Sequence, residues 1–216
     1  MSQSPPVIDT KPTTTSHNIF ARVYELLNSG LAESNFMIPL RREMVGKAHG
    51  LVLEIGAGTG FNFPYYQPGQ VERVEAIDPD TAMLRYARER LKTARVPIIL
   101  TQTAVETLPF ADKTFDTAVA TLVFCSVTDP LRGFREAMRV LKPGGTLLLV
   151  EHVRSQGAIA ARVQDALVPL TKLLSGNCHW NRATARTVAE VGFQVTFKRD
   201  IHSPLMPMIL LEATKN

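Results

Sequence analysis

A run of glycines follows a short apolar segment near residue 50 and points to ligand binding by the backbone. The apolar segment contains Glu54 and leads directly into Gly56, Gly58 and Gly60. Glycines permit positive φ and let the main chain approach a ligand closely. Asp78 ends the next apolar segment, where a nucleotide site in an α/β fold needs an acceptor for ribose hydroxyls. Together these residues predict a nucleotide-like ligand at the carboxyl ends of neighbouring strands.

The spacing of the glycines separates two kinds of nucleotide site. In the dinucleotide fingerprint, two residues stand between the second glycine and the third. Here Phe61 occupies the place of that third glycine, and Gly60 comes one residue early. The sequence also lacks a Tyr-x-x-x-Lys pair. These features argue against an NAD-dependent oxidoreductase, which stays open as an alternative, as does a non-catalytic protein that keeps the fold for binding.

Strand and helix patterns alternate from residue 50 onward. Apolar runs predict strands at 51–55, 71–77, 97–100, 115–121, 146–150, 193–199 and 208–213. Helical spacing predicts helices at 81–94, 130–141 and 184–191, and a long apolar stripe that faces the core at Ile159, Val163, Leu167, Leu170 and Leu174. This alternation indicates an α/β fold with helices on both faces of a parallel sheet. The short link between the last two strands predicts an antiparallel pair.

The chain of 216 residues is expected to form one domain. Residues 1–17 are rich in Pro, Ser and Thr and predict a flexible tail. Residues 18–216 predict the folded domain, with a helical lid over 18–48 and a helical insertion over 155–191.

The cysteines and the N-terminal sequence indicate the cellular compartment in which the protein is expected. The chain has two cysteines, Cys125 and Cys178, and no Cys-x-x-Cys pair, so we expect neither a disulfide framework nor a metal site. Reduced cytosol is the natural compartment for such a chain. No signal peptide and no run of 18 apolar residues is apparent, so the sequence predicts a cytoplasmic protein.

Five motifs carry a resemblance to a known superfamily. They are Glu-Ile-Gly-Ala-Gly-Thr-Gly at 54–60, Ile-Asp-Pro at 77–79, Val-Glu-Thr-Leu-Pro-Phe at 105–110, Phe-Asp at 115–116 and Arg-Val-Leu-Lys-Pro-Gly-Gly at 139–145. Over residues 50–152, and more loosely over 19–213, the chain resembles the class I S-adenosylmethionine-dependent methyltransferases. The resemblance implies a Rossmann-like, seven-stranded, mostly parallel sheet of order 3-2-1-4-5-7-6 with strand 7 antiparallel. It also implies S-adenosylmethionine as methyl donor and S-adenosylhomocysteine as product.

A closer likeness bears on the methyl acceptor. The segments Phe-Asn-Phe-Pro-Tyr-Tyr at 61–66, Thr-Leu-Val-Phe-Cys-Ser-Val at 121–127, Glu-His-Val at 151–153 and Cys-His-Trp-Asn-Arg at 178–182 are similar to the thiol methyltransferases of animal membranes and their bacterial relatives. This likeness implies a small, fairly apolar acceptor and favours a thiol. Methylation of a phospholipid amine or of a quinone carbon stays open as an alternative.

The resemblance also implies roles for residues of the donor site. The glycines lie beside the methionine part of the donor, Glu54 orients that part, and Asp78 accepts both ribose hydroxyls. Ala104 stands where many relatives have an acidic residue that binds the adenine amine. The implied donor-binding residues are Glu54, Gly56, Ala57, Gly58, Gly60, Asn62, Asp78, Pro79, Met83, Ala104, Val105, Glu106, Thr121 and Leu122.

The acceptor side is expected after the fifth strand. His152 stands at the end of that strand, and His179 and Arg182 lie in a later loop, so these three are the candidate catalytic residues. Methyl transfer from a sulfonium needs alignment more than acid–base machinery. Residues 49–151 hold eleven Lys/Arg and twelve Asp/Glu, whereas residues 152–216 hold eight and four. This basic segment allows peripheral contact with a membrane, and without a longer basic run we expect no nucleic-acid partner. The sequence predicts no oligomeric state.

Overall fold

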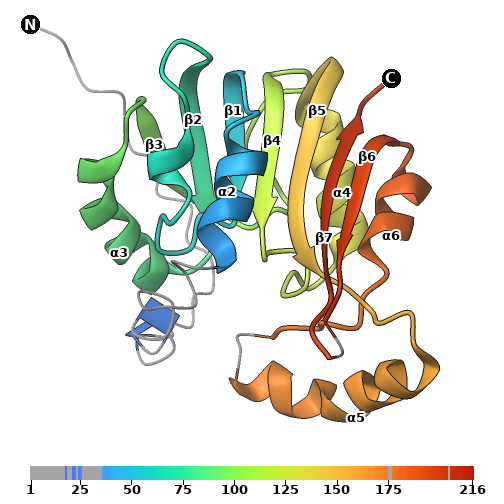
Figure 1. The fold of residues 1–216 in the computed structure, drawn as a ribbon. Coiled ribbons are helices and arrows are strands. Elements are labelled where there is room, and N and C mark those ends of the chain that lie inside the picture. Colours follow the sequence, from blue (N-terminus) through green and yellow to red (C-terminus); the bar gives the residue numbers. More distant parts are fainter. Residues whose placement is uncertain (1–17, 19–20, 23, 26–35, 175–176, 204) are drawn as a thin grey trace, which may run out of the picture.

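The computed structural model describes residues 18, 21–22, 24–25, 36–174, 177–203 and 205–216. The predicted tail at 1–17 and residues 19–20, 23 and 26–35 of the predicted lid lie outside these residues. The described part contains one mixed sheet whose strand order is β3-β2-β1-β4-β5-β7-β6 (Figure 1).

The sheet positions the site because its first five strands run parallel and end at one edge. The strands are β1 (Gly50–Ile55), β2 (Val71–Asp78), β3 (Ile98–Gln102), β4 (Phe115–Thr121), β5 (Leu141–His152), β6 (Gln194–Ile201) and β7 (Met208–Thr214). β7 pairs antiparallel with both β5 and β6. The predicted fold class, strand order and terminal antiparallel pair are confirmed.

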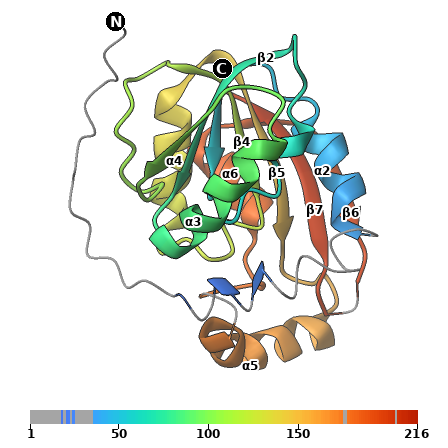
Figure 2. The same cartoon turned by 90° about the vertical axis from the view of Figure 1, so that its left-hand side faces the viewer.

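Helices cover both faces of this sheet (Figures 1 and 2). They are α2 (Ile38–Val45), α3 (Thr81–Arg90), α4 (Pro130–Val140), α5 (Ala158–Leu174) and α6 (Thr184–Val191), with 3-10 turns at Phe63–Tyr65 and Leu91–Thr93. α4 and α6 pack into one apolar cluster with the sheet, and α2 packs into the other. None of the helices in the described ranges is long and apolar enough to cross a bilayer.

Two aspartates fix where helices begin at the edge where the parallel strands end. The Asp80 side chain accepts a hydrogen bond from the Ala82 N–H at 2.7 Å, which caps α3. Asp129 caps α4 by accepting from the Arg132 N–H at 3.0 Å. Such caps satisfy backbone donors that have no partner within the helix. Each helix therefore starts directly after the loop that follows a parallel strand.

The prediction that the apolar stripe of α5 faces the core is wrong. Ile159 is 80% exposed and Leu170 is 52% exposed, while Gln164 is fully buried. The Gln164 amide donates to the carbonyl oxygens of Val153, Trp180 and Leu205, and its oxygen accepts from the Ser155 N–H at 2.7 Å. α5 lies beside irregular segments below the sheet (Figure 1), whose backbone groups need partners. Polar anchoring therefore decides which face of α5 is buried.

The predicted insertion at 155–191 divides into two different parts. α5 lies at the rim of the molecule, whereas α6 packs beside α4 with Val188 fully buried (Figure 1). Thus α6 is one of the layer helices that complete the fold.

Candidate functional site

The glycine turn lies between the ends of β1 and β2. The Ala57 N–H donates to the Ile77 carbonyl oxygen at 2.8 Å, which ties the turn to β2. Gly56 has a φ of +65°, and a Cβ there would lie 2.5 Å from the Val123 side chain. Only glycine fits this backbone conformation and this close approach. The turn is therefore packed directly against the segment that follows β4.

Asp78 joins the end of β2 to the glycine turn through its side chain. One carboxylate oxygen accepts from the Gly58 N–H at 2.9 Å, and the other accepts from the Asp80 N–H at 2.8 Å. Burial raises the pKa of Asp78 to about 6. Each carboxylate oxygen has more than one acceptor site, so both keep capacity for a ligand hydroxyl. The carboxylate is thus held in place with acceptor capacity to spare.

Glu54 lies at the centre of a buried polar network. Its carboxylate accepts from Asn62 Nδ2 at 3.1 Å and from the Tyr66 hydroxyl at 2.8 Å. Asn62 Nδ2 also donates to Thr121 Oγ1 at 3.2 Å, and Arg41 donates to Asn62 Oδ1 at 2.6 Å. The network joins β1, the glycine turn, α2 and β4. Glu54, Asn62 and Thr121 were predicted as site residues and lie together here.

Two members of this network, Arg41 and Tyr66, were missed from the sequence. Arg41 stands in a helix far from any motif, and Tyr66 follows the glycines by several residues. Burial raises the pKa of Glu54 to about 7, against the lowering effect of its hydrogen bonds with Tyr66 and Asn62. A buried acid needs such partners. Glu54 just before the glycines was therefore a signal that buried donors must lie nearby.

The turn also carries a polar group that has no partner among the described residues. Thr59 is 1% exposed, and its Oγ1 has no hydrogen-bond partner there. A buried hydroxyl without a partner is uncommon in native structures. Its place within the glycine turn fits a ligand that supplies the missing hydrogen bond.

Described residues of the N-terminal segment lie against the same turn. Glu25 forms an ion pair with Arg90, and Arg90 donates to the Thr59 carbonyl oxygen at 2.8 Å. The Tyr24 ring lies 6.4 Å from the Phe61 ring, measured between centroids. The lid predicted for 18–48 remains a prediction, and these contacts show that part of that segment lies beside the glycine turn.

The other residues predicted to bind the donor differ in burial and in their contacts. Met83 is buried in α3, and Pro79 is exposed at the end of β2. Val105 packs in the core beside Gly133 of α4. Glu106 accepts from the Thr128 and Asp129 N–H groups at 3.1 and 3.2 Å.

The structure thus gives Val105 and Glu106 packing and anchoring contacts. Ala104 is half-buried, and Leu122 has a φ of +59° directly after β4. Their contacts with a donor stay predictions.

On the acceptor side, the loop at 177–182 is docked onto the segment at 123–127. The His179 N–H donates to the Cys125 carbonyl oxygen at 2.7 Å. Arg182 donates to the carbonyl oxygens of Phe124 and Val127, the latter at 2.7 Å. The two segments are far apart in sequence, and these bonds hold them side by side.

Of the three predicted acceptor residues, His179 and Arg182 lie in contact in this loop, and His152 lies beside the two cysteines. His152 and Cys178 each have a side-chain atom within 4.8 Å of the Cys125 sulfur. His179 Nδ1 lies 2.7 Å from the Asn177 carbonyl oxygen and 3.2 Å from Arg182. Burial lowers the pKa of His179, so its imidazole is neutral at pH 7. The Arg182 guanidinium donates its hydrogen bonds to backbone carbonyl oxygens, and these bonds hold the loop in position.

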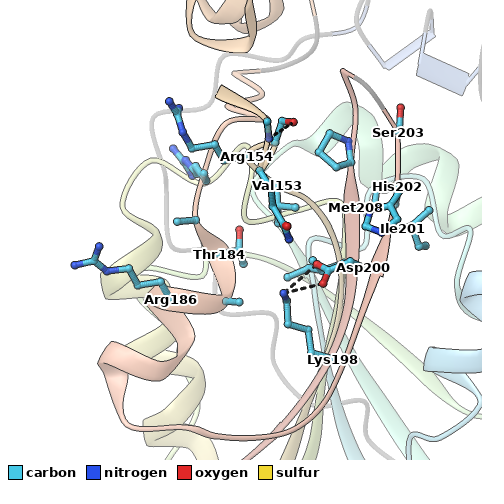
Figure 3. Close-up of a pocket in the computed structure, with 18 residues that line it drawn as sticks. Val153, Arg154, Thr184, Arg186, Lys198, Asp200, Ile201, His202, Ser203 and Met208 are labelled. Atoms are coloured by element: carbon cyan, nitrogen blue, oxygen red, sulfur yellow. Dashed lines mark hydrogen bonds and ion pairs between the residues drawn. The ribbon is translucent and has the colours of Figure 1, made fainter. Parts of the chain in front are cut away.

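A separate cavity of about 430 Å³ lies against β6, β7 and the start of α6 (Figure 3). Of the predicted site residues, only Arg182 lines it. Within it, Lys198 and Asp200 point toward one another and form an ion pair at 2.9 Å (Figure 3). The cavity therefore lies apart from the glycine turn.

Comparisons with known proteins agree with this geometry. Residues 53–149 match the family model described as a methyltransferase domain. The chain is 34% identical to the thiol S-methyltransferase TMT1B of Rattus norvegicus over 146 residues, which cover 66% of this chain and 59% of the relative. It spans between 59% and 67% of the length of the thiol methyltransferases that it matches.

Two relatives with other acceptors in their names are matched over more of their length. The phosphatidylethanolamine N-methyltransferase of Cereibacter sphaeroides is 33% identical, with 80% of this chain and 83% of the relative covered. The ubiquinone/menaquinone biosynthesis C-methyltransferase UbiE of Pseudomonas fluorescens is 30% identical, with 84% and 75% covered.

Solved structures share the fold. The [4+2]-cyclase SpnF superposes with a TM-score of 0.71 at 18% identity, covering 94% of this chain and 97% of that one. A putative methyltransferase of Bacillus halodurans gives 0.68 at 18% identity, covering 84% and 99%. With the glycine turn, Asp78 and these relatives together, the chain belongs to the S-adenosylmethionine-dependent methyltransferases.

Proposed function

We propose that this methyltransferase transfers the methyl group to the sulfur of a small, fairly apolar thiol. The observation that carries the proposal is the meeting of 121–127, 151–153 and 178–182, the segments that resemble the thiol methyltransferases. Glu151 accepts from the Val123 and Phe124 N–H groups, both at 2.8 Å, and the loop docks onto the same stretch. Relatives named as thiol S-methyltransferases are 31–34% identical to this chain.

The donor-site residues hold different parts of S-adenosylmethionine. This donor carries the methyl group on a positively charged sulfur. Asp78 accepts the ribose hydroxyls with the acceptor capacity that its two backbone contacts leave. The glycine turn brings backbone close to the methionine part, and Thr59 Oγ1 gains the partner that it lacks among the described residues. Glu54 holds Asn62 in place, and through Asn62 it holds Thr121 at the end of β4.

To methylate a thiol, the acceptor side needs only to align the sulfur with the methyl group and to accept one proton. An ordinary thiol has a pKa of about 8.5, so a useful fraction is ionised near neutral pH. The short contact between His179 Nδ1 and the Asn177 carbonyl oxygen needs a proton on Nδ1, which leaves Nε2 basic. We assign neutral His179 the role of proton acceptor, His152 that of an acceptor-site group, and Arg182 that of a positioning residue.

The second candidate is methylation of a phospholipid amine or a quinone carbon. It is favoured by two relatives with those names that are covered to 83% and 75% of their length. The exposed apolar residues of α5 and the basic residues 152–216 would suit an acceptor presented at a membrane surface, where the protein makes peripheral contact.

The two candidates are separated by a transfer assay with radiolabelled methyl donor. The acceptors are a panel of alkyl and aryl thiols, phosphatidylethanolamine vesicles and a quinol, each with the wild type and with Asp78→Ala as the donor-site control. We expect label in the thioethers, and no label with the variant. Label confined to the lipid or to the quinol would overturn the thiol proposal in favour of the second candidate.

A further inference from the structure

Three side chains from distant parts of the sequence form a compact cluster at the acceptor end of the sheet. Cys125 follows β4, His152 ends β5, and Cys178 lies in the loop before α6. One potential ligand atom from each lies within 4.8 Å of the other two. The Cys125 side chain is buried, and the other two residues are half-buried. The cluster is therefore largely sheltered from solvent.

The donor set has a recognisable chemical preference. Two thiols and an imidazole suit zinc and similar soft cations, whereas Mg²⁺ and Ca²⁺ take oxygen ligands. The neighbouring carboxylate, Glu151, is occupied by the N–H groups of Val123 and Phe124. Tetrahedral zinc has bonds of about 2.3 Å to sulfur and about 2.0 Å to nitrogen. The three atoms, within 4.8 Å of one another, therefore lie close enough to approach one ion by side-chain rotation.

The backbone around the cluster is already fixed. The His179 N–H donates to the Cys125 carbonyl oxygen at 2.7 Å, and Asn177 Nδ2 donates to the Ser126 carbonyl oxygen at 3.0 Å. On the other side, His152 is held in register with Met208 of β7. Binding an ion would therefore require little movement of the main chain.

His152 also carries a buried ring nitrogen, Nδ1, without a hydrogen-bond partner among the described residues. A buried ring nitrogen without a partner is unfavourable, and a metal ion is one partner that an imidazole nitrogen accepts.

We propose that Cys125, His152 and Cys178 bind a divalent cation of the zinc class, with a fourth coordination position open to an exogenous ligand. Three protein ligands with one free position are the arrangement found in catalytic rather than structural zinc sites. The ion would also join the loop at 177–182 to the ends of β4 and β5. This site does not depend on which acceptor is methylated.

Binding is tested on the metal-free, reduced full-length protein by calorimetric titration with Zn²⁺ and by absorption with Co²⁺ as a spectroscopic probe. We expect one equivalent of each, with a thiolate-to-cobalt charge-transfer band and the visible bands of a tetrahedral ion. Cys178→Ser and His152→Ala should each weaken Zn²⁺ binding by about 100-fold or more. His202→Ala, an exposed histidine outside the cluster, is the matched control and should leave affinity unchanged.

Several results would overturn the proposal. One is Zn²⁺ affinity that is the same in Cys178→Ser as in the wild type. Another is formation of a Cys125–Cys178 disulfide with glutathione disulfide in a protein that binds no Zn²⁺, which would make the pair a redox couple. Cys125 is in the core, so Cys178→Ser, in the loop, keeps the test valid if Cys125→Ser fails to fold.

A separate experiment tests whether the fourth coordination position of the ion is open. Titration of a small thiol into the cobalt-loaded protein should change the visible bands in a saturable way and strengthen the charge-transfer band. A spectrum that a large excess of thiol leaves unchanged would show a closed site and overturn this part of the proposal.

Discussion

The two ends of the site differ in how they are built. On the donor side, Glu54 and Asp78 are 1% and 8% exposed, and backbone or buried side chains hold each of them. On the acceptor side, Ile159 and Leu170 are exposed, and residues 152–216 carry eight Lys/Arg against four Asp/Glu. The predicted donor side is thus built from buried acids with fixed partners, whereas on the predicted acceptor side α5 exposes apolar residues and is attached through the buried Gln164. Changes on one side should therefore leave the other nearly intact.

The glycine turn should be the most sensitive point. Gly56→Ala combines positive φ with a clash against Val123, and we expect a loss of about 3 kcal/mol in the free energy of unfolding. Gly69 also has positive φ, at +85°, but nothing lies within 4 Å of an added Cβ. Gly69→Ala should therefore lose only about 1 kcal/mol. Urea denaturation of both variants, and of Gly56→Ala combined with Val123→Ala, checks this; equal losses in the two single variants would contradict it.

Loss of the Asp78 carboxylate should act on the donor alone. Asp78→Ala removes a charged acceptor for two hydroxyls, and we expect about 100-fold weaker S-adenosylmethionine binding. Calorimetry measures the affinity, and circular dichroism checks the fold. Undiminished affinity in a folded variant would exclude the ribose role.

Donor affinity should also depend on pH through Asp78. Because burial raises its pKa to about 6, the carboxyl becomes protonated as the pH falls through 6 and loses acceptor strength. We expect about tenfold weaker donor binding at pH 5 than at pH 8. For stability the sign is opposite: the raised pKa favours the folded state at low pH, and this contribution is lost as the pH rises from about 4 to 6. Asp78→Asn should flatten the affinity profile, and a wild-type affinity constant from pH 5 to 8 would contradict the assignment.

A substitution that weakens the anchoring of α5 should leave the affinity for the methyl donor nearly unchanged. Gln164→Ala leaves the backbone groups that anchor α5 without partners, at a cost of about 1 kcal/mol or more. We expect the acceptor KM to rise about fivefold while donor affinity changes less than twofold. Steady-state kinetics with calorimetry separates the two. A parallel loss of donor affinity would show that the two sides are not independent.

The smallest effect concerns the adenine end of the donor. Ala104→Asp places an acceptor where the resemblance implies contact with the adenine amine, and we expect about threefold tighter donor binding. Ala104→Asn is the matched control for size. If Ala104→Asp binds the donor no better than wild type, this segment does not face the adenine.

Prediction from sequence succeeded where local pattern and topology agree. The strand runs, the glycine turn and the position of Asp78 are all local features, and they predicted the sheet and the edge at which the glycine turn meets Asp78. It failed where tertiary contacts decide: Gln164 reverses the buried face of α5 by bonding four backbone groups. It also missed Arg41, which reaches Asn62 from α2. The expected absence of a metal site rested on sequence spacing, which cannot reveal that Cys125, His152 and Cys178 come together.

The central claim is that the glycine turn and Asp78 form a site for the methyl donor. Side-by-side calorimetry of the wild-type protein with S-adenosylmethionine, S-adenosylhomocysteine and NAD tests it most directly. The account predicts saturable one-to-one binding of the first two and no binding of NAD. Binding of NAD without binding of either methionine-derived ligand would contradict it.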